Sequence, residues 1–249
     1  MNREKGPSWE VYERLIARMF ADQIQTDLCV TPNAYIFGEI TGTKRQIDVL
    51  IDDRHNTDNS RRIIVDAKKR ARPLDVTDVE AFLGLMDDVR ATHGYLVSSS
   101  GHSKAAEKRA QEAASLRIVP LDRMENFDPS SWPRCLKNGC AKGRIFWDGY
   151  PEIYLVARST VTPADRRVVR FIHYVGKCDR CGRFHVLCTT CGDLMSVSED
   201  DEQDVGHQCR CNGPWFWLAS IEEDHEGRKS AELHSIHGDK VVTETRRSL

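Results

Sequence analysis

The cysteines of this chain are concentrated in its second half, and that asymmetry divides the sequence more sharply than any other feature. Only Cys29, which we expect to be buried and inert, lies in the first 130 residues. The other eight form four pairs, which are, in chain order, Cys135 and Cys140, Cys178 and Cys181, Cys188 and Cys191, and Cys209 and Cys211. A cysteine-poor N-terminal domain followed by a cysteine-rich C-terminal domain is therefore expected.

Two of these pairs have the form Cys-x-x-Cys-Gly, as "CDRCG" and "CTTCG". This spacing lets two thiolates bind one Zn²⁺ while turn N–H groups point at the sulfurs and glycine adopts the turn conformation. Because the pattern is repeated and is followed by "CRC", it favours one or two structural Zn²⁺ ions over redox-active cysteine pairs.

The spacing leaves the pairing of the cysteines open. In one arrangement the third and fourth pairs form a zinc-ribbon-like site, and the first and second pairs share another Zn²⁺. In the other, the second pair joins the fourth. His185 and His207 are near enough along the chain to replace a cysteine, although surface or hydrogen-bonded histidines are commoner. The aromatic residues Trp215, Phe216 and Trp217 are expected to form the core of this domain rather than to stack on bases.

Composition narrows the class of protein. With 249 residues, of which 40% are hydrophobic and 30% charged, the chain can bury a substantial core as a globular protein. A net charge of −2 excludes a strongly basic field over the whole molecule, so contacts with nucleic acid must come from local patches. The N-terminus has no apolar signal segment, and no run approaches the ~18 residues of a membrane span. We expect a cytoplasmic protein without a membrane partner.

Apolar spacing predicts an α/β domain in the first half. Helical periodicity marks residues 8–22, 74–90 and 103–115, and β-like runs cover 33–40, 45–51, 61–67, 93–100 and 116–121. Three consecutive strands followed by alternating helices and strands predict a mixed sheet flanked by helices.

The second half is expected to be β-rich. Its candidate strands cover residues 144–147, 152–158, 167–176 and 214–221, and the prolines of "ENFDPSSWPR" indicate a linker. The predicted division is an α/β domain at 1–124, a linker at 125–140, a small β-rich zinc-binding domain at 141–222 and a charged, flexible tail at 223–249.

Two acidic residues interrupt the apolar strands of the first domain. Asp48 lies inside "RQIDVLI" and Asp66 ends the run "IIVD", where an unpaired carboxylate is costly. Neighbouring carboxylates repel each other, and a hard cation with oxygen ligands, Mg²⁺ or Mn²⁺, removes that conflict. Lys68 follows Asp66 by two residues, so both side chains lie on one face of a strand. Two carboxylates, a metal ion and a lysine together predict hydrolysis of a phosphodiester.

Four segments of the first domain together resemble the Mrr-like restriction endonuclease domain of the PD-(D/E)XK nuclease superfamily: "WEVYERLIARMF", "RQIDVLI", "IIVDAKKRARPLDVTDVEAFLGLMDDVRATHGYLVSSSGHSKAAEKRA" and "RIVPL". The resemblance covers residues 8–123 and implies a restriction-endonuclease-like fold. Asp48 matches the metal-binding acid of the second strand, Asp66 and Lys68 match the second acid and the lysine, and Glu13 matches the helical glutamate that often completes the metal site. The chain departs from the family at His102, where an aromatic residue is usual, and at Asp66, where Glu or Gln is more frequent.

Basic residues flank this candidate site. Lys69, Arg70 and Arg72 follow Lys68, and Lys104 begins the alanine-rich helix. Beside a phosphodiester-cleaving site such cations would contact DNA phosphates without reading bases, although a solvated surface explains them equally well. Residues 98–101 could bind a phosphate through backbone N–H groups at a helix N-terminus, or simply form a turn and cap.

The sequence thus predicts a metal-dependent DNA endonuclease in which the zinc domain helps to select DNA or a protein partner. The resemblance implies action on modified or foreign DNA, with a homodimer as one way to cut both strands. Two alternatives stay open: a DNA-binding or sensing protein that uses the nuclease fold without cleaving, and a zinc adaptor that uses it for docking.

Overall fold

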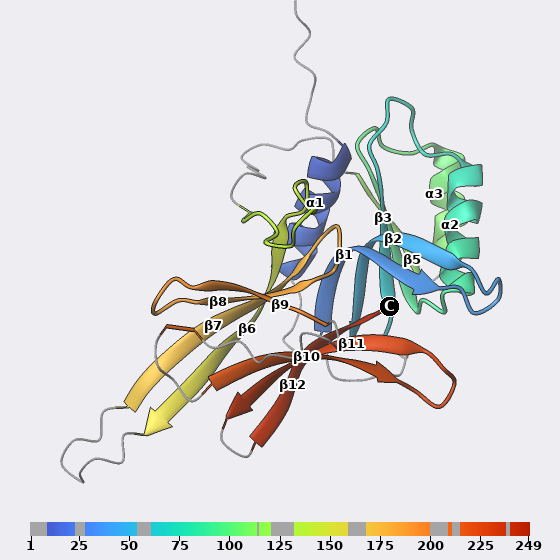
Figure 1. Ribbon diagram of the computed structural model, residues 1–249. Coiled ribbons are helices and arrows are strands. Elements are labelled where there is room, and N and C mark those ends of the chain that lie inside the picture. The colour runs from blue at the N-terminus through green and yellow to red at the C-terminus, as the bar shows by residue number, and fades with distance from the viewer. Residues whose placement is uncertain are drawn as a thin grey trace, which may run out of the picture. The chain divides into compact units, whose positions relative to one another are not determined.

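The computed structural model describes residues 9–22, 28–53, 61–113, 115–120, 132–158, 168–199, 209–210, 215–237 and 240–249. The chain divides into two compact units, Met1–Ser131 and Trp132–Leu249, whose elements are labelled in Figure 1. None of the described helices is long and apolar enough to cross a membrane.

The first unit is a mixed five-stranded sheet flanked by helices, which confirms the predicted fold class. Its elements are α1 (Trp9–Ala21), β1 (Leu28–Phe37), β2 (Lys44–Asp53), β3 (Ile63–Lys68), α2 (Val76–Asp88), β4 (His93–Ser98), α3 (Lys104–Glu112) and β5 (Leu116–Pro120). The strands lie in chain order across the sheet. The pairs β1–β2 and β2–β3 are antiparallel, whereas β3–β4 and β4–β5 are parallel.

Helices cover both faces of this sheet, with α1 on one side and α2 and α3 on the other (Figure 1). Ile64 of β3 and Leu96 of β4 share a core cluster with Phe82 of α2. Tyr95, the neighbour of Leu96, contacts Phe20 of α1 with ring centroids 5.0 Å apart. Strands β3 and β4 are rich in β-branched and apolar residues because both of their faces are buried.

Side-chain caps fix the segments that follow β3 and β4. The Asp78 N–H donates to the Asp75 side chain at 3.1 Å, and the Asp75 N–H donates back to the Asp78 carboxylate at 2.9 Å. This reciprocal capping box starts α2. The Ala106 N–H donates to Ser103 Oγ at 3.1 Å and starts α3. Both caps lie after the C-terminal ends of the parallel strands, so they order the segments next to the candidate site.

The second unit is rich in β-strands, as predicted, and its described residues form two sheets. One antiparallel sheet contains β6 (Ile145–Arg158), β7 (Val168–Cys178), β8 (Phe184–Cys188) and β9 (Leu194–Val197), and another contains β10 (Trp215–Glu223), β11 (Lys229–His237) and β12 (Lys240–Ser248). Trp217 is fully buried in the core of this unit with Phe184, Val186 and Leu233. The structure therefore agrees with a core role for Trp217, while the side chains of Trp215 and Phe216 lie outside the described ones.

The segment 223–249, predicted as a flexible tail, forms strands instead. β11 pairs with β10 and with β12, with a bulge between Leu233 and His234. Ala231 and Leu233 are fully buried and alternate with the charged Glu232. The prediction was wrong because the exposed face carries so much charge that it masks the period-two pattern of the buried face.

The predicted linker 125–140 was too long at its C-terminal end. Trp132 packs against Phe146 with ring centroids 4.9 Å apart. The Cys135 N–H donates to the Gly143 carbonyl at 3.1 Å. Residues 132–140 therefore belong to the second unit, together with the first cysteine pair, while 121–131 lie outside the described residues.

Candidate active site and zinc centres

The two candidate acids lie where β2 and β3 stop pairing. Their ladder ends at Val49 opposite Val65, and the next position in the same register places Asp48 opposite Asp66. The Ala67 N–H donates to Asp48 Oδ2 at 2.7 Å. A side-chain carboxylate thus takes the role of a main-chain acceptor, and the two acids face each other where the ladder ends.

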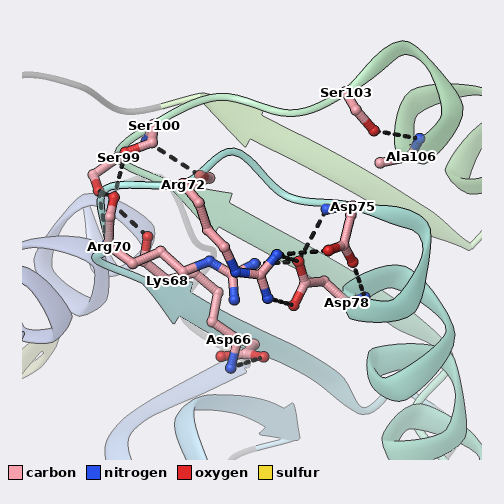
Figure 2. A network of polar contacts seen from close by, with 11 residues as sticks. Asp66, Lys68, Arg70, Arg72, Asp75, Asp78, Ser99, Ser100, Ser103 and Ala106 are labelled. Carbon is pink, nitrogen blue, oxygen red and sulfur yellow. Dashed lines mark hydrogen bonds and ion pairs between the residues drawn. The ribbon is translucent and has the colours of Figure 1, made fainter.

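Lys68 completes this cluster, as its two-residue spacing from Asp66 indicated. The Lys68 Nζ lies 2.7 Å from Asp66 Oδ2 (Figure 2). β3 continues to pair with β4 as far as Lys68 opposite Ser98, so the other edge of β3 holds both side chains in position. The side chains of Lys68 and Asp66 are 37% and 17% exposed, which leaves the pair accessible from solvent.

The electrostatics of Asp48 are unfavourable without a cation. Burial and then the charge of Asp66 raise the pKa of Asp48 from 3.8 to about 7, while the Ala67 N–H and Lys68 oppose the shift. Two carboxylates whose ionisation is mutually unfavourable are a hard oxygen donor set of the kind that Mg²⁺ and Mn²⁺ prefer. The residues present therefore fit a divalent metal ion.

Asn33 is a residue of this region that sequence reasoning missed. It has a left-handed backbone, with φ 51°, in the middle of β1. The β1–β2 register places it opposite Asp48, and that pair is absent from the ladder between Pro32–Val49 and Ala34–Ile47. Its side chain accepts a hydrogen bond from Gln46 Nε2 at 2.7 Å. Pairing of β2 is thus interrupted on both sides of Asp48, which separates this position from the regular sheet.

Glu13 lies on α1, the helix that contacts β1, β2 and β3. Its chain neighbours Tyr12 and Arg14 are buried, and Glu13 itself is partly exposed. The helix is therefore adjacent to the strands that carry the acids. A role for Glu13 as a metal ligand stays a prediction.

The four basic residues predicted to contact DNA fall into two groups. Arg70 pairs with Asp78, and Arg72 Nη1 lies 2.6 Å from Asp75 and 3.3 Å from Asp78 (Figure 2). Burial acts to raise the pKa of Asp78, but the bonds from Arg70 and the Asp75 N–H hold it below its usual value. Lys69 and Lys104, by contrast, form no ion pair with any residue in the described parts of the chain.

The serines that follow β4 form hydrogen bonds with the main chain of a neighbouring segment. The Arg70 N–H donates to Ser99 Oγ at 3.2 Å, and the hydroxyl of Ser100 donates to the Arg70 carbonyl (Figure 2). The Ser100 N–H donates to Ser98 Oγ at 3.2 Å. These bonds tie the loop after β4 to the segment after β3, which favours the turn role over phosphate binding.

Residues 7–127 match the Mrr_cat family model, described as restriction endonuclease. The first unit is a restriction-endonuclease domain. A solved structure titled "Crystal Structure of Protein of Unknown Function AF1548" is similar at 15% identity with a TM-score of 0.38, and the match covers 47% of this chain and 61% of that one. No curated protein matches the sequence.

The unit that follows the restriction-endonuclease domain brings the first two cysteine pairs together. The Sγ atoms of Cys135 and Cys181 are 3.7 Å apart, as are those of Cys140 and Cys178, and all four lie within 4.8 Å of one another. Sulfurs at ~2.3 Å from a tetrahedral Zn²⁺ would be about 3.8 Å apart. A Cβ at Gly143 would lie within 2.6 Å of two of these sulfurs, so only glycine permits the approach. The four thiols fit a closed zinc site, so the second pair joins the first, and Cys209 lies in a different group of donor atoms.

Main-chain N–H groups point at these sulfurs. The Lys137 N–H donates to Cys135 Sγ and the Arg180 N–H to Cys178 Sγ, both at 3.4 Å. Hydrogen bonding from Cys178 lowers the pKa of Cys181, which favours the thiolate form that binds a metal ion. These are the features by which a turn prepares sulfur to bind a metal ion.

His185 lies beside this centre and does not replace a cysteine. The Leu136 N–H donates to its Nε2 at 3.2 Å, and its Nδ1 lies 3.0 Å from the Arg183 carbonyl, to which it donates. Both ring nitrogens therefore have main-chain partners, one in each cysteine loop. His185 links the two loops, while His207 lies outside the described residues.

The second Cys-x-x-Cys-Gly turn has the same backbone as the first. The Gly192 N–H donates to the Cys188 carbonyl at 2.8 Å, and the corresponding bond from Gly182 to Cys178 measures 2.9 Å. The φ angles of the two glycines are 73° and 68°. The residues gathered here are Cys188, Cys209 and the unpredicted His173. Cys191 instead hydrogen-bonds to Asp193, and Cys211 lies outside the described residues.

Proposed function

We propose that this protein is a divalent-metal-dependent DNA endonuclease whose reaction takes place at Asp48, Asp66 and Lys68. The observation that carries the proposal is the pair of opposed carboxylates at the end of the β2–β3 ladder, with Lys68 against one of them. The restriction-endonuclease domain that contains them supports DNA as the substrate. Asp48 and Asp66 would hold Mg²⁺ or Mn²⁺, with Glu13 as a further ligand.

The bound ion would polarise the scissile phosphate and make an attacking water more acidic. Asp48 and Asp66 would supply the negative charge that fixes it, and Asp48 would give up its proton on binding. Lys68, whose ammonium is 2.7 Å from Asp66, would donate to the phosphoryl oxygens as charge develops there. The water oxygen would bond to phosphorus while one P–O ester bond breaks, and the proton that the water loses would balance the proton that the leaving oxygen takes up.

We further propose two structural Zn²⁺ ions in the second unit. The tetrahedral spacing of the first two cysteine pairs supports one ion. The matching backbone of the second turn supports another, held by the third and fourth pairs. The zinc unit would help to select DNA or a protein partner.

In the first unit, the cations best suited to contact DNA phosphates are Lys69 and Lys104. Neither has a carboxylate partner among the described residues.

The test is cleavage of plain and modified duplex DNA by the full chain with Mg²⁺ or Mn²⁺, using wild type, D66A and the control D87A, which changes an exposed acid of α2. Wild type and D87A should cleave, and D66A should not. Equal activity of wild type and D66A would refute the catalytic assignment. DNA binding without turnover under either metal would support the catalytically silent alternative.

Restriction of modified or foreign DNA is the role that we propose for this activity. A preference for modified over plain DNA in the same assay would support it. A homodimer would place two such sites on opposite strands, and light scattering with and without DNA would detect it.

A further inference from the structure

His173 lies among the cysteines of the second centre. It is fully buried, and its Nε2 is 3.9 Å from Cys209 Sγ. With Cys188 and Cys209 it forms a group whose donor atoms all lie within 4.8 Å of one another. By position alone, it would be counted as the third ligand of a zinc ion.

Trp217 fixes the tautomer of this histidine. The Trp217 Nε1 is 3.0 Å from His173 Nδ1, and an indole N–H can only donate. Nδ1 must therefore keep its lone pair, and the proton of the neutral ring lies on Nε2, on the side of Cys209. A zinc-bound histidine has the reverse arrangement, since the nitrogen away from the metal donates its proton to an oxygen. Zinc at Nε2 would leave the His173 ring with no proton at all.

Cys191 can supply the thiolate that His173 does not replace. Its turn has the backbone of the first turn, in which Cys181 joins its cluster, so the same backbone can present Cys191 to the second centre. The Asp193 carboxylate to which Cys191 now bonds already accepts two bonds from Arg210, at 2.6 and 2.8 Å. Losing the contact with Cys191 would therefore leave Asp193 satisfied.

We propose that His173 is not a ligand of the second zinc ion but a positioning residue that donates its Nε2–H to the sulfur of Cys209, and that Cys191 joins Cys188 and Cys209 as a thiolate ligand. The inference rests on the proposed zinc binding of this unit. Zn²⁺ with three or more thiolates carries excess negative charge, which is costly in a buried site unless N–H groups donate to the sulfurs. His173 provides such a donor, and Trp217 orients it. At the first centre, main-chain N–H groups donate to the sulfurs.

The tautomer can be measured on the wild-type, zinc-loaded full chain by ¹⁵N-edited NMR of the histidine side chains. We expect His173 to carry its proton on Nε2 and to have an unprotonated, hydrogen-bonded Nδ1. A proton on Nδ1 together with a metal-shifted Nε2 would overturn the proposal. This measurement requires no variant and so does not depend on the folding of a mutant.

A matched pair of substitutions gives a second readout. H173Q keeps an N–H donor and is a poor zinc ligand, whereas H173L keeps neither function. We expect wild type, H173Q and H173L each to bind two zinc ions, with the second ion ~10–100-fold weaker in H173L by chelator competition. C191S should bind only one. Loss of one ion in both H173Q and H173L, with two retained in C191S, would make His173 a ligand and refute the proposal. Absence of zinc from wild type would instead refute the zinc proposal as a whole.

Discussion

The acid pair of the first unit and the first cysteine cluster of the second unit both collect groups that repel one another once ionised. They differ in how complete the donor set is. Asp48 and Asp66 offer two carboxylates beside a partly exposed lysine, whereas the first cysteine cluster offers four sulfurs, from Cys135, Cys140, Cys178 and Cys181, enough to fill a tetrahedral site. An incomplete set leaves positions for water and phosphate, and a complete one leaves none. The acid pair would therefore support a reaction, whereas the cysteine cluster would only stabilise the fold.

The largest effect is expected from removing one of the four cysteines of the first cluster. C178S leaves three thiols, and structural Zn²⁺ contributes about 10 kcal/mol or more to the folding of small zinc modules. We expect the variant to lose one zinc ion and the cooperative unfolding of the second unit. Metal analysis and calorimetry measure both, with C29A as a control that should keep its full zinc content. Retention of both ions by C178S would contradict the assignment.

Removing Lys68 from beside the acid pair should slow the reaction strongly without affecting the fold. Since Lys68 would stabilise charge only as the phosphate reacts, we expect K68A to lose about 10²–10³-fold in cleavage rate. Its DNA affinity and melting temperature should stay close to those of wild type. K108A, an exposed lysine of α3, is the matched control. A loss of DNA binding equal to the loss of rate would give Lys68 a binding role instead.

Neutralising one acid should stabilise the metal-free protein. Because folding raises the pKa of Asp48 from 3.8 to about 7, the folded state holds a proton that the unfolded state has lost, and stability falls as pH rises from about 4 through 7. D48N removes this dependence and still accepts the Ala67 N–H. We expect higher stability than wild type by ~1 kcal/mol or more at pH 8, a gain of a few degrees in Tm.

The gain from D48N should shrink at pH 5, where Asp48 is already protonated in the folded state. Metal binding and cleavage should be lost at every pH, because the amide cannot supply the charge. Thermal melts at both pH values, with and without Mg²⁺, test the prediction. A D48N protein that is less stable than wild type at pH 8 would argue against repulsion between the two acids.

A smaller loss of stability is expected when the arginines beside the site are replaced, and it should be larger for the less exposed one. Arg70 is 24% exposed and pairs with Asp78, and Arg72 is 56% exposed. We expect R70A to lose about 1–2 kcal/mol in urea unfolding and R72A less than about 0.5 kcal/mol. A fall in DNA affinity for R70A, without any loss of stability, would instead show that this arginine serves the substrate.

The smallest effect is expected at the phosphate contacts. K104A should reduce DNA affinity only a few-fold and equally for all sequences, and should lower the slope of log affinity against log salt by about 0.9 if one contact is lost. Fluorescence anisotropy at several salt concentrations measures the slope. An unchanged slope would place Lys104 outside the DNA interface.

The fold class of the first unit and the positions of its two acids could be predicted from the amino-acid sequence. Local period-two and helical patterns define those elements, and the spacing of Asp66 and Lys68 places both on one face of a strand. The sequence also identified the zinc-binding turns, since Cys-x-x-Cys-Gly specifies a local backbone. Such features depend on residues that are close along the chain.

Contacts between residues that are far apart along the chain became known only from the folded structure. No local pattern connects the segments that form three of these contacts. They are the cluster of the first and second cysteine pairs, the left-handed Asn33 opposite Asp48, and the hydrogen bond from Trp217 to His173. The charged strands β11 and β12 were not predicted for a related reason. Their few apolar residues become buried only because Trp217 and its neighbours pack over them. Composition describes a segment by itself, whereas burial depends on what the rest of the chain places over it.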